Sequence, residues 1–554
     1  LNNLYQKTEK QQLHKIYYNN RHFNMDAANV LKLYRYDKTK ISKLSGSFSF
    51  VIYYKKTQQV EAYRDQLGIR PLYYFYNNSL LVYSTDPELI FIDPKIKKEI
   101  NKNKVIFYIL KGNRKNDETF YKNIFRLRRS NFLRIQNKNM QIGSYFSFAN
   151  KPLIKYKSNE EYSEHFYDLF YDIIKNQLST PDKKVSLMLS GGLDTSSITS
   201  MSEKVAREKN INVDLKTYSI TFNDIKDKDF KKTYETNYIN DVLNLSRLKS
   251  KIIDLDYVDV QNQLGSMQSF YPEPNYHGNK YMDLAIIKEM KKDSRKVILS
   301  GFDGDSAITH GEQFLFELLH KYKFKDFFKQ LKLKKELRKQ SFSYMEAFRS
   351  YIFPQIIPNY LYLVRGVFKK NYPSYQTSRF LKKELKKTLP IYDMARQYQS
   401  SKKNYSEFHL NSINTNVWEH VFETQDIDYG REGMEVRYPF MDKRLIDYCL
   451  RIPSNQKMQN GITRFILRNA MKDTIPDSVF YRYDKSILSP YYDYSFEINF
   501  SNMKKKILQS ESILVDIIDF DYINSLELKR MTLNESIIFQ HIYVLSIWLE
   551  FKKF

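Results

Sequence analysis

Apolar runs and amphipathic stretches alternate through the middle of the chain. Short, largely apolar runs at 185–189, 215–222, 251–255 and 296–299 predict buried strands, and helical spacing of apolar residues predicts helices at 161–178, 234–243 and 281–291. This strand–helix–strand order predicts a parallel, doubly wound sheet, which makes the fold class α/β. Ligands of such sheets bind at the carboxyl ends of the strands, so the loops that follow these runs are the first candidates for chemistry.

The first 150 residues follow a different pattern. Small or polar residues alternate with large apolar residues at 46–54, and further strand-like runs follow at 60–74 and 80–85. We therefore predict a β-rich domain at 1–150, a linker at 150–160, and a second domain at 151–554. Within the second domain, the sequence predicts a helical and heavily basic insertion at 312–400. We interpret it first as a solvated face and second as a surface for an anionic partner.

The run at 185–189 ends in a turn that is suited to an anion. Two glycines, Gly191 and Gly192, permit a sharp turn and a close approach of the backbone to a ligand. Backbone N–H groups and the dipole of the following helix favour a phosphate there. Hydroxyl donors accompany them at Ser190, Thr195 and Ser196. The predicted phosphate site is therefore the stretch from Leu189 to Ser196.

One residue of this turn, Asp194, does not suit a bare anion. A carboxylate repels a phosphate unless a cation lies between them, so Asp194 indicates Mg²⁺. The turn also lacks the lysine of a Walker motif, which argues against γ-phosphate transfer and favours a released pyrophosphate. A second glycine turn with acidic residues follows the run at 296–299. Its aspartates, Asp303 and Asp305, are two residues apart and also suit Mg²⁺.

Composition limits the functional classes. The 554 residues contain 42% hydrophobic residues, no apolar run of about 20 residues, and no signal-peptide core near the start. The single cysteine, Cys449, excludes an internal disulfide and fits a reducing cytoplasm. The net charge of +26 is compatible with nucleic-acid binding, but lysine here accompanies abundant Asn, Ile, Tyr and Phe. We prefer an AT-rich genome as the explanation of the positive charge, with nucleic-acid binding second and an anionic substrate third. We expect no nucleic-acid partner and no membrane span.

The two glycine turns together identify a family resemblance. Residues 190–197 and 300–306 resemble two signatures of ATP pyrophosphatases, in particular asparagine synthetases and their relatives, the β-lactam synthetases and lasso-peptide cyclases. The resemblance implies ATP and Mg²⁺ as cofactors. It also implies activation of a carboxylate as an acyl-adenylate, release of pyrophosphate and AMP, and amide formation with an amine. The implied fold is an ATP-pyrophosphatase-type sheet, preceded by a glutaminase-like α+β domain of the N-terminal-nucleophile type.

The resemblance also implies roles for individual residues. Asp194 and Asp305 would hold the metal, and Asp303 would be a second metal ligand. Residues 430–445 resemble a third signature, in which Glu435 would be the base or orient it and Arg437 would pair with an acid or the substrate. In a last signature, Lys485 would neutralise charge on the phosphates, with Arg482 as the second choice. The implied nucleotide contacts further include Ser219, Thr221, Phe222, Ser300, Gly301 and Phe302.

Two departures from the family pattern refine this interpretation. Phe302 stands where asparagine synthetases have glutamate and β-lactam synthetases have tyrosine, which removes a proton acceptor and puts free aspartate in doubt. Residue 1 is leucine and the only cysteine is Cys449, which predicts that the glutaminase-like domain is shortened and inactive, or that the sequence is truncated.

We predict an ATP-dependent carboxylate–amine ligase and favour a lasso-type macrolactam cyclase that acts on a precursor peptide with a leader-peptidase partner. The alternatives are an asparagine synthetase, dependent on glutamine or ammonia, and an inactive basic scaffold that binds peptide or nucleic acid.

Overall fold

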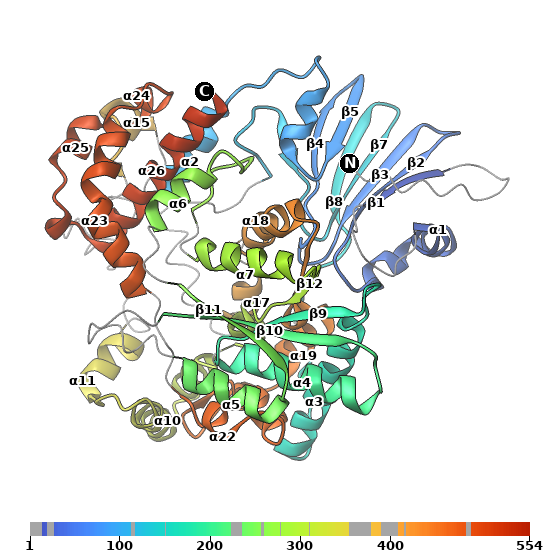
Figure 1. The fold of residues 1–554 in the computed structure, drawn as a ribbon, viewed down its shortest axis with the longest axis vertical. Coiled ribbons are helices and arrows are strands. Elements are labelled where there is room, and N and C mark those ends of the chain that lie inside the picture. The colour runs from blue at the N-terminus through green and yellow to red at the C-terminus, as the bar shows by residue number, and fades with distance from the viewer. Residues whose placement is uncertain are drawn as a thin grey trace.

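A five-stranded parallel sheet forms the centre of the molecule (Figure 1). The computed structural model describes residues 14–18, 27–111, 117–149, 151–222, 235–255, 260–276, 279–309, 311–353, 378–388, 408–414, 417–483 and 489–554. The strand order is β11 (Lys249–Asp254), β10 (Asp214–Thr221), β9 (Lys184–Met188), β12 (Val297–Leu299) and β13 (Glu435–Arg437), and every neighbouring pair is parallel. The predicted parallel sheet is confirmed, with β9 at its centre.

Helices cover both faces of this sheet, as the strand–helix alternation predicts. One face carries α3 (Asn159–Gln177), α4 (Leu193–Glu208) and α5 (Thr236–Ser246), and the other carries α7 (Lys280–Lys292) and α18 (Val417–Arg431) (Figure 1). Buried Val185 and Leu187 of β9 belong to the core shared by these layers. Helix α4 begins at Leu193, directly after the glycine turn. The N–H groups at its start, which have no acceptor within the helix, therefore lie at the carboxyl end of β9.

The N-terminal region is β-rich, in agreement with its alternating pattern. An antiparallel sheet joins β1 (His14–Tyr18), β2 (Ser49–Tyr54), β3 (Gln59–Arg64), β7 (Asn131–Gln136) and β8 (Asn139–Ser144). A smaller sheet joins β5 (Leu80–Ser84), β4 (Tyr73–Asn77) and β6 (Ile124–Arg126), and helix α1 (Ala27–Tyr36) packs near β1. Residues of the two sheets pack together in a core that includes Val51, Leu72 and Leu133.

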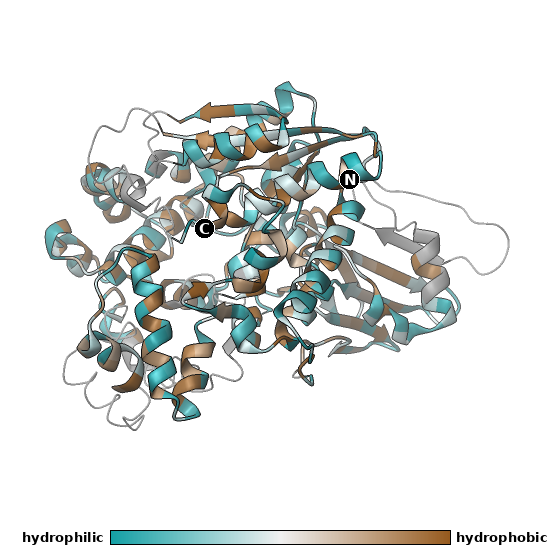
Figure 2. Cartoon of the chain, turned by 90° about the horizontal axis from the view of Figure 1, so that it is seen from below, coloured by the Kyte–Doolittle hydropathy of each residue, from teal (hydrophilic) through white to brown (hydrophobic). Residues whose placement is uncertain are grey.

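The C-terminal helices form a further layer beside the N-terminal sheets. Helices α23 (Ser489–Leu508) and α26 (Leu533–Lys552) pack on each other, on α6 (Val260–Met267) and, through α26, on α2 (Lys102–Lys111). The start of α26 is fixed by a capping box in which Thr532 and Glu535 bond to each other's backbone N–H groups. Figure 2 shows hydrophobic and hydrophilic residues mixed along the helices of the chain, as expected for helices that pack one face on a core. No helix in the described part of the chain is long and apolar enough to cross a membrane.

The basic region at 312–400 is helical where the structure describes it, with α9 (Gln313–His320), α10 (Phe324–Leu337), α11 (Tyr344–Ala347) and α15 (Lys383–Thr388). Three lysines of α10 have acidic partners. Lys334 contacts Glu312 at 2.5 Å, and Lys335 contacts Glu346 at 3.1 Å. Lys332 lies 3.8 Å from Glu336. These pairs neutralise three lysines of α10, and Lys334 is buried. The interpretation of the region as a solvated face stays a prediction.

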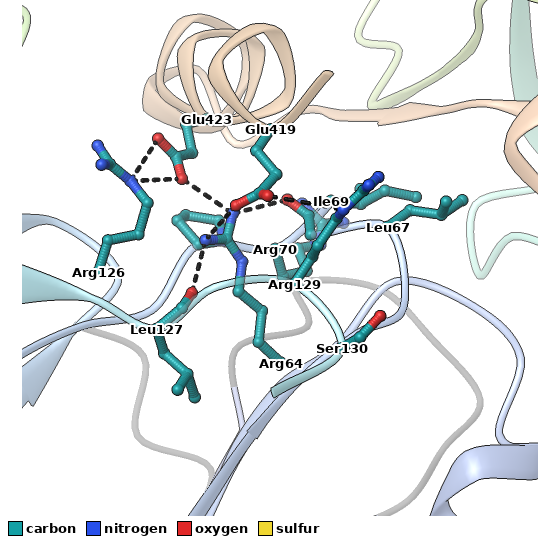
Figure 3. A network of polar contacts seen from close by, with 12 residues as sticks. Arg64, Leu67, Ile69, Arg70, Arg126, Leu127, Arg129, Ser130, Glu419 and Glu423 are labelled. Carbon is teal, nitrogen blue, oxygen red and sulfur yellow. Dashed lines mark hydrogen bonds and ion pairs between the residues drawn. The ribbon is translucent and has the colours of Figure 1, made fainter. Parts of the chain in front are cut away.

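A buried ion network connects the N-terminal sheets to α18 (Figure 3). The guanidinium of Arg64, which is fully buried, contacts Glu423 at 2.9 Å and Glu419 at 3.5 Å. Arg126 Nε contacts the same Glu423 oxygen, Oε1, at 2.9 Å and also pairs with Glu273. Because Arg64 and Arg126 lie in β3 and β6, the network holds two strands of the N-terminal sheets on one helix of the central layer.

Candidate active site

A cavity of about 360 Å³ lies at the carboxyl ends of β9, β10 and β12. Ten of the nucleotide-site residues predicted from the sequence line it: Leu189, Ser190, Gly192, Asp194, Thr195, Thr221, Phe222, Ser300, Gly301 and Phe302. They come from three separate segments of the chain. The structure therefore brings the two glycine turns and the end of β10 around one space, as a doubly wound sheet should.

The first turn is held by its own hydroxyl groups. The Ser190 backbone N–H donates to Thr195 Oγ1 at 3.1 Å, and the Gly192 N–H donates to Ser190 Oγ at 3.3 Å. Gly192 precedes α4 as a helix N-cap and makes no side-chain cap bond. The first backbone N–H groups of α4 consequently lie at the end of the helix that borders the cavity, where the helix dipole favours a negatively charged group.

Close packing makes glycine necessary in both turns. Gly191 has φ +73°, and a Cβ there would lie 2.9 Å from Tyr238 Cβ. At Gly301 a Cβ would lie 2.7 Å from Thr195 Cγ2, because the turn after β12 packs directly on the start of α4. A Cβ at Gly304 would lie 2.8 Å from Asp194 Oδ1. These contacts fix the backbone of the two turns against each other.

The two carboxylates predicted to bind metal converge on one point. Arg464 Nη1 lies 2.8 Å from both carboxylate oxygens of Asp194 and 2.6 Å from Asp305 Oδ1. Burial alone would lower the pKa of Arg464, but the charges of Asp194 and Asp305 raise it. No group of three or more His, Cys, Asp or Glu side chains forms a metal site among the described residues. Two converging carboxylates nevertheless fit Mg²⁺, which commonly takes one or two carboxylates and completes its shell with water and substrate phosphates.

Two more arginines line the same end of the cavity. Arg482 contacts Glu235 at 3.0 Å, donates to the Gly191 carbonyl at 3.3 Å, and lies over the ring of Tyr238 at 4.1 Å. Arg468 lies over the ring of Tyr483, and burial with the nearby charge of Arg464 lowers its pKa to about 10. Arg464 and Arg482 thus place two guanidinium groups beside the glycine turn, and Arg468 also lines the cavity, an arrangement that suits a polyphosphate.

Asp303 lies beside this cavity rather than in its lining. It has φ +50° and precedes α8 (Gly304–Ile308) as the N-cap residue. Its carboxylate accepts from Ser306 Oγ at 2.7 Å and from Trp418 Nε1. Burial raises the pKa of Asp303. The structure therefore gives this predicted metal ligand two protein donors, and α18 supplies one of them.

Glu435 and Arg437, predicted as catalytic residues, lie at a second cavity of about 900 Å³. Arg70 of the N-terminal region lies 3.1 Å from Glu435, and Arg437 lies 3.5 Å from it. Arg437 also donates to the carbonyls of Gln177 and Ser179 after α3, and burial lowers its pKa. Neither side chain lines the cavity that collects the glycine turns, and their catalytic roles stay predictions.

Four further predicted residues, Gly191, Ser196, Ser219 and Asp305, are not among the residues that line the nucleotide cavity. Ser196 is buried within α4, and Ser219 is buried within β10. Lys485, the predicted phosphate-neutralising residue, lies outside the residues that the structure describes. Arg482, the second choice for that role, lines the cavity.

Sequence reasoning assigned no role to Arg464, Arg468 or Asp283, although all three line the cavity. Arg464 is the N-cap residue of α21 (Phe465–Met471) and Arg468 lies within that helix, so both arginines belong to its start. Asp283 lies in the first turn of α7, where an acidic residue is common for reasons of helix stability alone. Its pattern therefore carried no functional signal.

Comparisons with known proteins agree with this geometry. A family model described as asparagine synthase matches residues 165–548, and one described as a glutamine amidotransferase domain matches residues 6–146. A putative glutamine-hydrolysing asparagine synthetase 2 of Methanocaldococcus jannaschii is 28% identical over 53% of this chain and 56% of its own length. Asparagine synthetase 1 of Bacillus subtilis is 24% identical over 83% of this chain and 71% of its own. Amidase chry2 of Gibberella zeae is 21% identical over 84% and 73%.

Proposed function

Because the chain belongs to the asparagine synthase family, whose members are ATP-dependent ligases that form AMP and pyrophosphate, we propose that it amidates a carboxylate through an acyl-adenylate. The observation that carries this proposal is the cavity that collects both glycine turns and three arginines at the carboxyl ends of β9, β10 and β12. The fold of this region is accordingly proposed to be of the ATP-pyrophosphatase type, with the glutamine amidotransferase-like domain before it.

The cavity offers a place for each part of ATP. Thr221 and Phe222, at the end of β10, would contact the adenosine, and the turn from Ser190 to Thr195 would hold the β- and γ-phosphates. Arg482 and Arg464 lie beside this turn and would stabilise the negative charge that develops on the leaving pyrophosphate. Asp194 and Asp305 would hold Mg²⁺, which supplies a further positive charge to the phosphates. In that state Arg464 would exchange its contacts with these carboxylates for contacts with phosphate oxygens.

The carboxylate substrate is a finer proposal. The relatives described above carry the names of asparagine synthetases and of one amidase, and these names favour a small carboxylate with an amide product. The macrolactam interpretation of the sequence has no support from these comparisons. L-Aspartate is therefore the first substrate to test, followed by a panel of other amino acids and short acidic peptides.

Isotope exchange between ATP and pyrophosphate tests the first half-reaction. We expect carboxylate-dependent exchange, and AMP rather than ADP as the product when an amine is added. Asp194→Asn should reduce the exchange by about 100-fold or more, because a carboxylate beside the phosphates is lost. Glu203→Gln is the matched control, since Glu203 lies on the same helix and pairs with exposed Arg207. ADP as the stoichiometric product would refute the proposal.

A further inference from the structure

A single carboxylate, Asp283, lies in the cavity wall formed by α7. The side chain is 15% exposed and lines the same space as the glycine turns. Tyr429 Oη approaches Asp283 Oδ1 at 3.3 Å, and Gln425 Nε2 approaches Oδ2 at 3.4 Å. Both partners come from α18, so the carboxylate is oriented by two long hydrogen bonds from one helix. Long bonds of this kind leave lone pairs of the oxygens able to accept from a ligand.

The charge around Asp283 is not balanced locally. Its cationic neighbour, Lys280, lies 4.0 Å away and makes its close contact with Asp428 instead. Tyr271 Oη donates to that same Asp428 carboxylate. The cluster thus contains two carboxylates for one ammonium group. The other acidic residues of the lining, Asp194 and Glu235, each contact an arginine at 3.0 Å or less.

This distribution polarises the cavity. The end beside the glycine turn carries the guanidinium groups of Arg464 and Arg482, whereas the α7 wall carries Asp283. A positive end suits a polyphosphate, and a negative wall attracts an ammonium ion or a protonated amine. The two ends therefore match the two charged reactants of an amide ligase.

The neighbouring part of the described wall is formed by the ring of Phe302, which offers no carboxylate. The ring of Phe302 packs edge-on against Phe422 at 5.6 Å and Tyr438 at 6.1 Å. Tyr438 Oη in turn donates to Gln425 Oε1 at 2.7 Å, and Gln425 is the residue that approaches Asp283. Phe302 and Asp283 are consequently joined through two shared side chains on one wall. Asp283 supplies the only carboxylate on the α7 side of the described lining.

The electrostatic setting also favours proton acceptance. Burial raises the pKa of Asp283, and Lys280, Gln425 and Tyr429 lower it by a smaller amount. A carboxylate with a raised pKa is a stronger base than one in water, and general bases work best when their pKa approaches the operating pH.

We propose that Asp283 binds the amine substrate, as ammonium or a protonated primary amine, and accepts a proton from the nitrogen during amide formation. This inference rests on the proposed function. The bound ammonium first releases one proton to solvent. The neutral nitrogen then forms a bond to the acyl carbon, a second proton passes from nitrogen to the Asp283 carboxylate, and AMP leaves with the electron pair of the broken C–O bond.

The test separates the two half-reactions with the carboxylate that supports ATP–pyrophosphate exchange in the wild type. Asp283→Asn keeps the shape of the side chain and removes the negative charge. We expect it to retain exchange within about threefold, to slow amide formation from ammonium by about 100-fold or more, and to raise the KM for ammonium. Glu289→Gln is the matched control on the same helix, because Glu289 pairs with Lys292 and Lys251 near the other end of α7.

Two further measurements keep the test decisive. Hydroxylamine is a weaker base than ammonia and is largely neutral near neutral pH, so its attack should depend much less on Asp283. Formate should restore part of the amide formation in Asp283→Ala, because a small carboxylate can occupy the vacated space. Equal loss of exchange and amide formation in Asp283→Asn, or unchanged amide formation, would overturn this inference alone. Absence of exchange by the wild type with every carboxylate would overturn the proposed function as well.

Discussion

Replacing Glu423 by glutamine tests the buried network that joins the N-terminal sheets to α18 (Figure 3). The Glu423 side chain is 5% exposed and faces two arginines, Arg64 and Arg126, at 2.9 Å each. Removing one partner from a buried ion pair typically costs ~3–5 kcal/mol, because the remaining charge stays buried without compensation. Glutamine keeps a carbonyl acceptor, and Glu419 and Glu273 still face the arginines. We therefore expect the lower end of this range, about 3 kcal/mol.

Urea unfolding followed by tryptophan fluorescence measures this cost. One of the two tryptophans, Trp418, lies on α18 next to Glu419, so its emission reports on the junction. Because a chain with two domains can unfold in steps, the comparison uses the midpoint and slope of the transition that Trp418 reports. Asp516→Asn is the control, since Asp516 is 67% exposed in its pair with Lys102 and should cost less than about 1 kcal/mol. Equal effects of the two substitutions would refute our account of the network.

Three other predictions concern the cavity and the core. Gly301→Ala should lower ATP–pyrophosphate exchange by about tenfold or more, because its Cβ would lie 2.7 Å from Thr195 Cγ2; adding Thr195→Ser, which removes that methyl group, should recover part of the loss. Burial raises the pKa of Cys449 to about 12, so a thiol reagent should react slowly with the native chain. In urea the same reagent should label one thiol per chain, and rapid labelling of the native chain would contradict this prediction. Burial and the charge of Lys457 hold the pKa of His409 well below 6.5. The neutral His409 therefore contributes its full stability above pH 6.5, and the free energy of unfolding falls by about 1.4 kcal/mol per pH unit as the pH drops below 6.5. His409→Gln should flatten that slope when the free energy of unfolding is measured by urea titration at several pH values.

Local sequence signals predicted the strands and turns well. The run at 185–189 is largely apolar, and the glycines after it favour a tight turn. A few adjacent residues are therefore enough to predict β9 and the start of a helix after it. Apolar residues with helical spacing resume only at Ile198, whereas α4 begins at Leu193, because polar residues at a helix start hide the periodicity. The single cysteine, Cys449, is buried in α19 (Lys443–Arg451) and belongs to the core.

Long-range contacts were beyond the reach of the sequence. Arg464 contacts Asp194, which lies 270 positions earlier in the chain, and no local sequence pattern predicts that contact. The same limit applies to Glu435, whose 3.1 Å partner Arg70 belongs to the N-terminal region. A carboxylate in a motif can be recognised from its neighbours in sequence, but the cation beside it decides whether it is available for chemistry.

The close contacts of the two glycine turns divide the cavity into a part that tolerates little change and a part that can vary. At Gly191, Gly301 and Gly304 even one added carbon would lie within 2.9 Å of a neighbouring atom. The rest of the lining includes the side chains of Met282 and Ile286 on α7 and that of Phe302, whose size can change without moving the backbone. New acceptor or carboxylate specificities should therefore arise on α7 and at position 302, and a library confined to those positions would keep the nucleotide half of the enzyme intact.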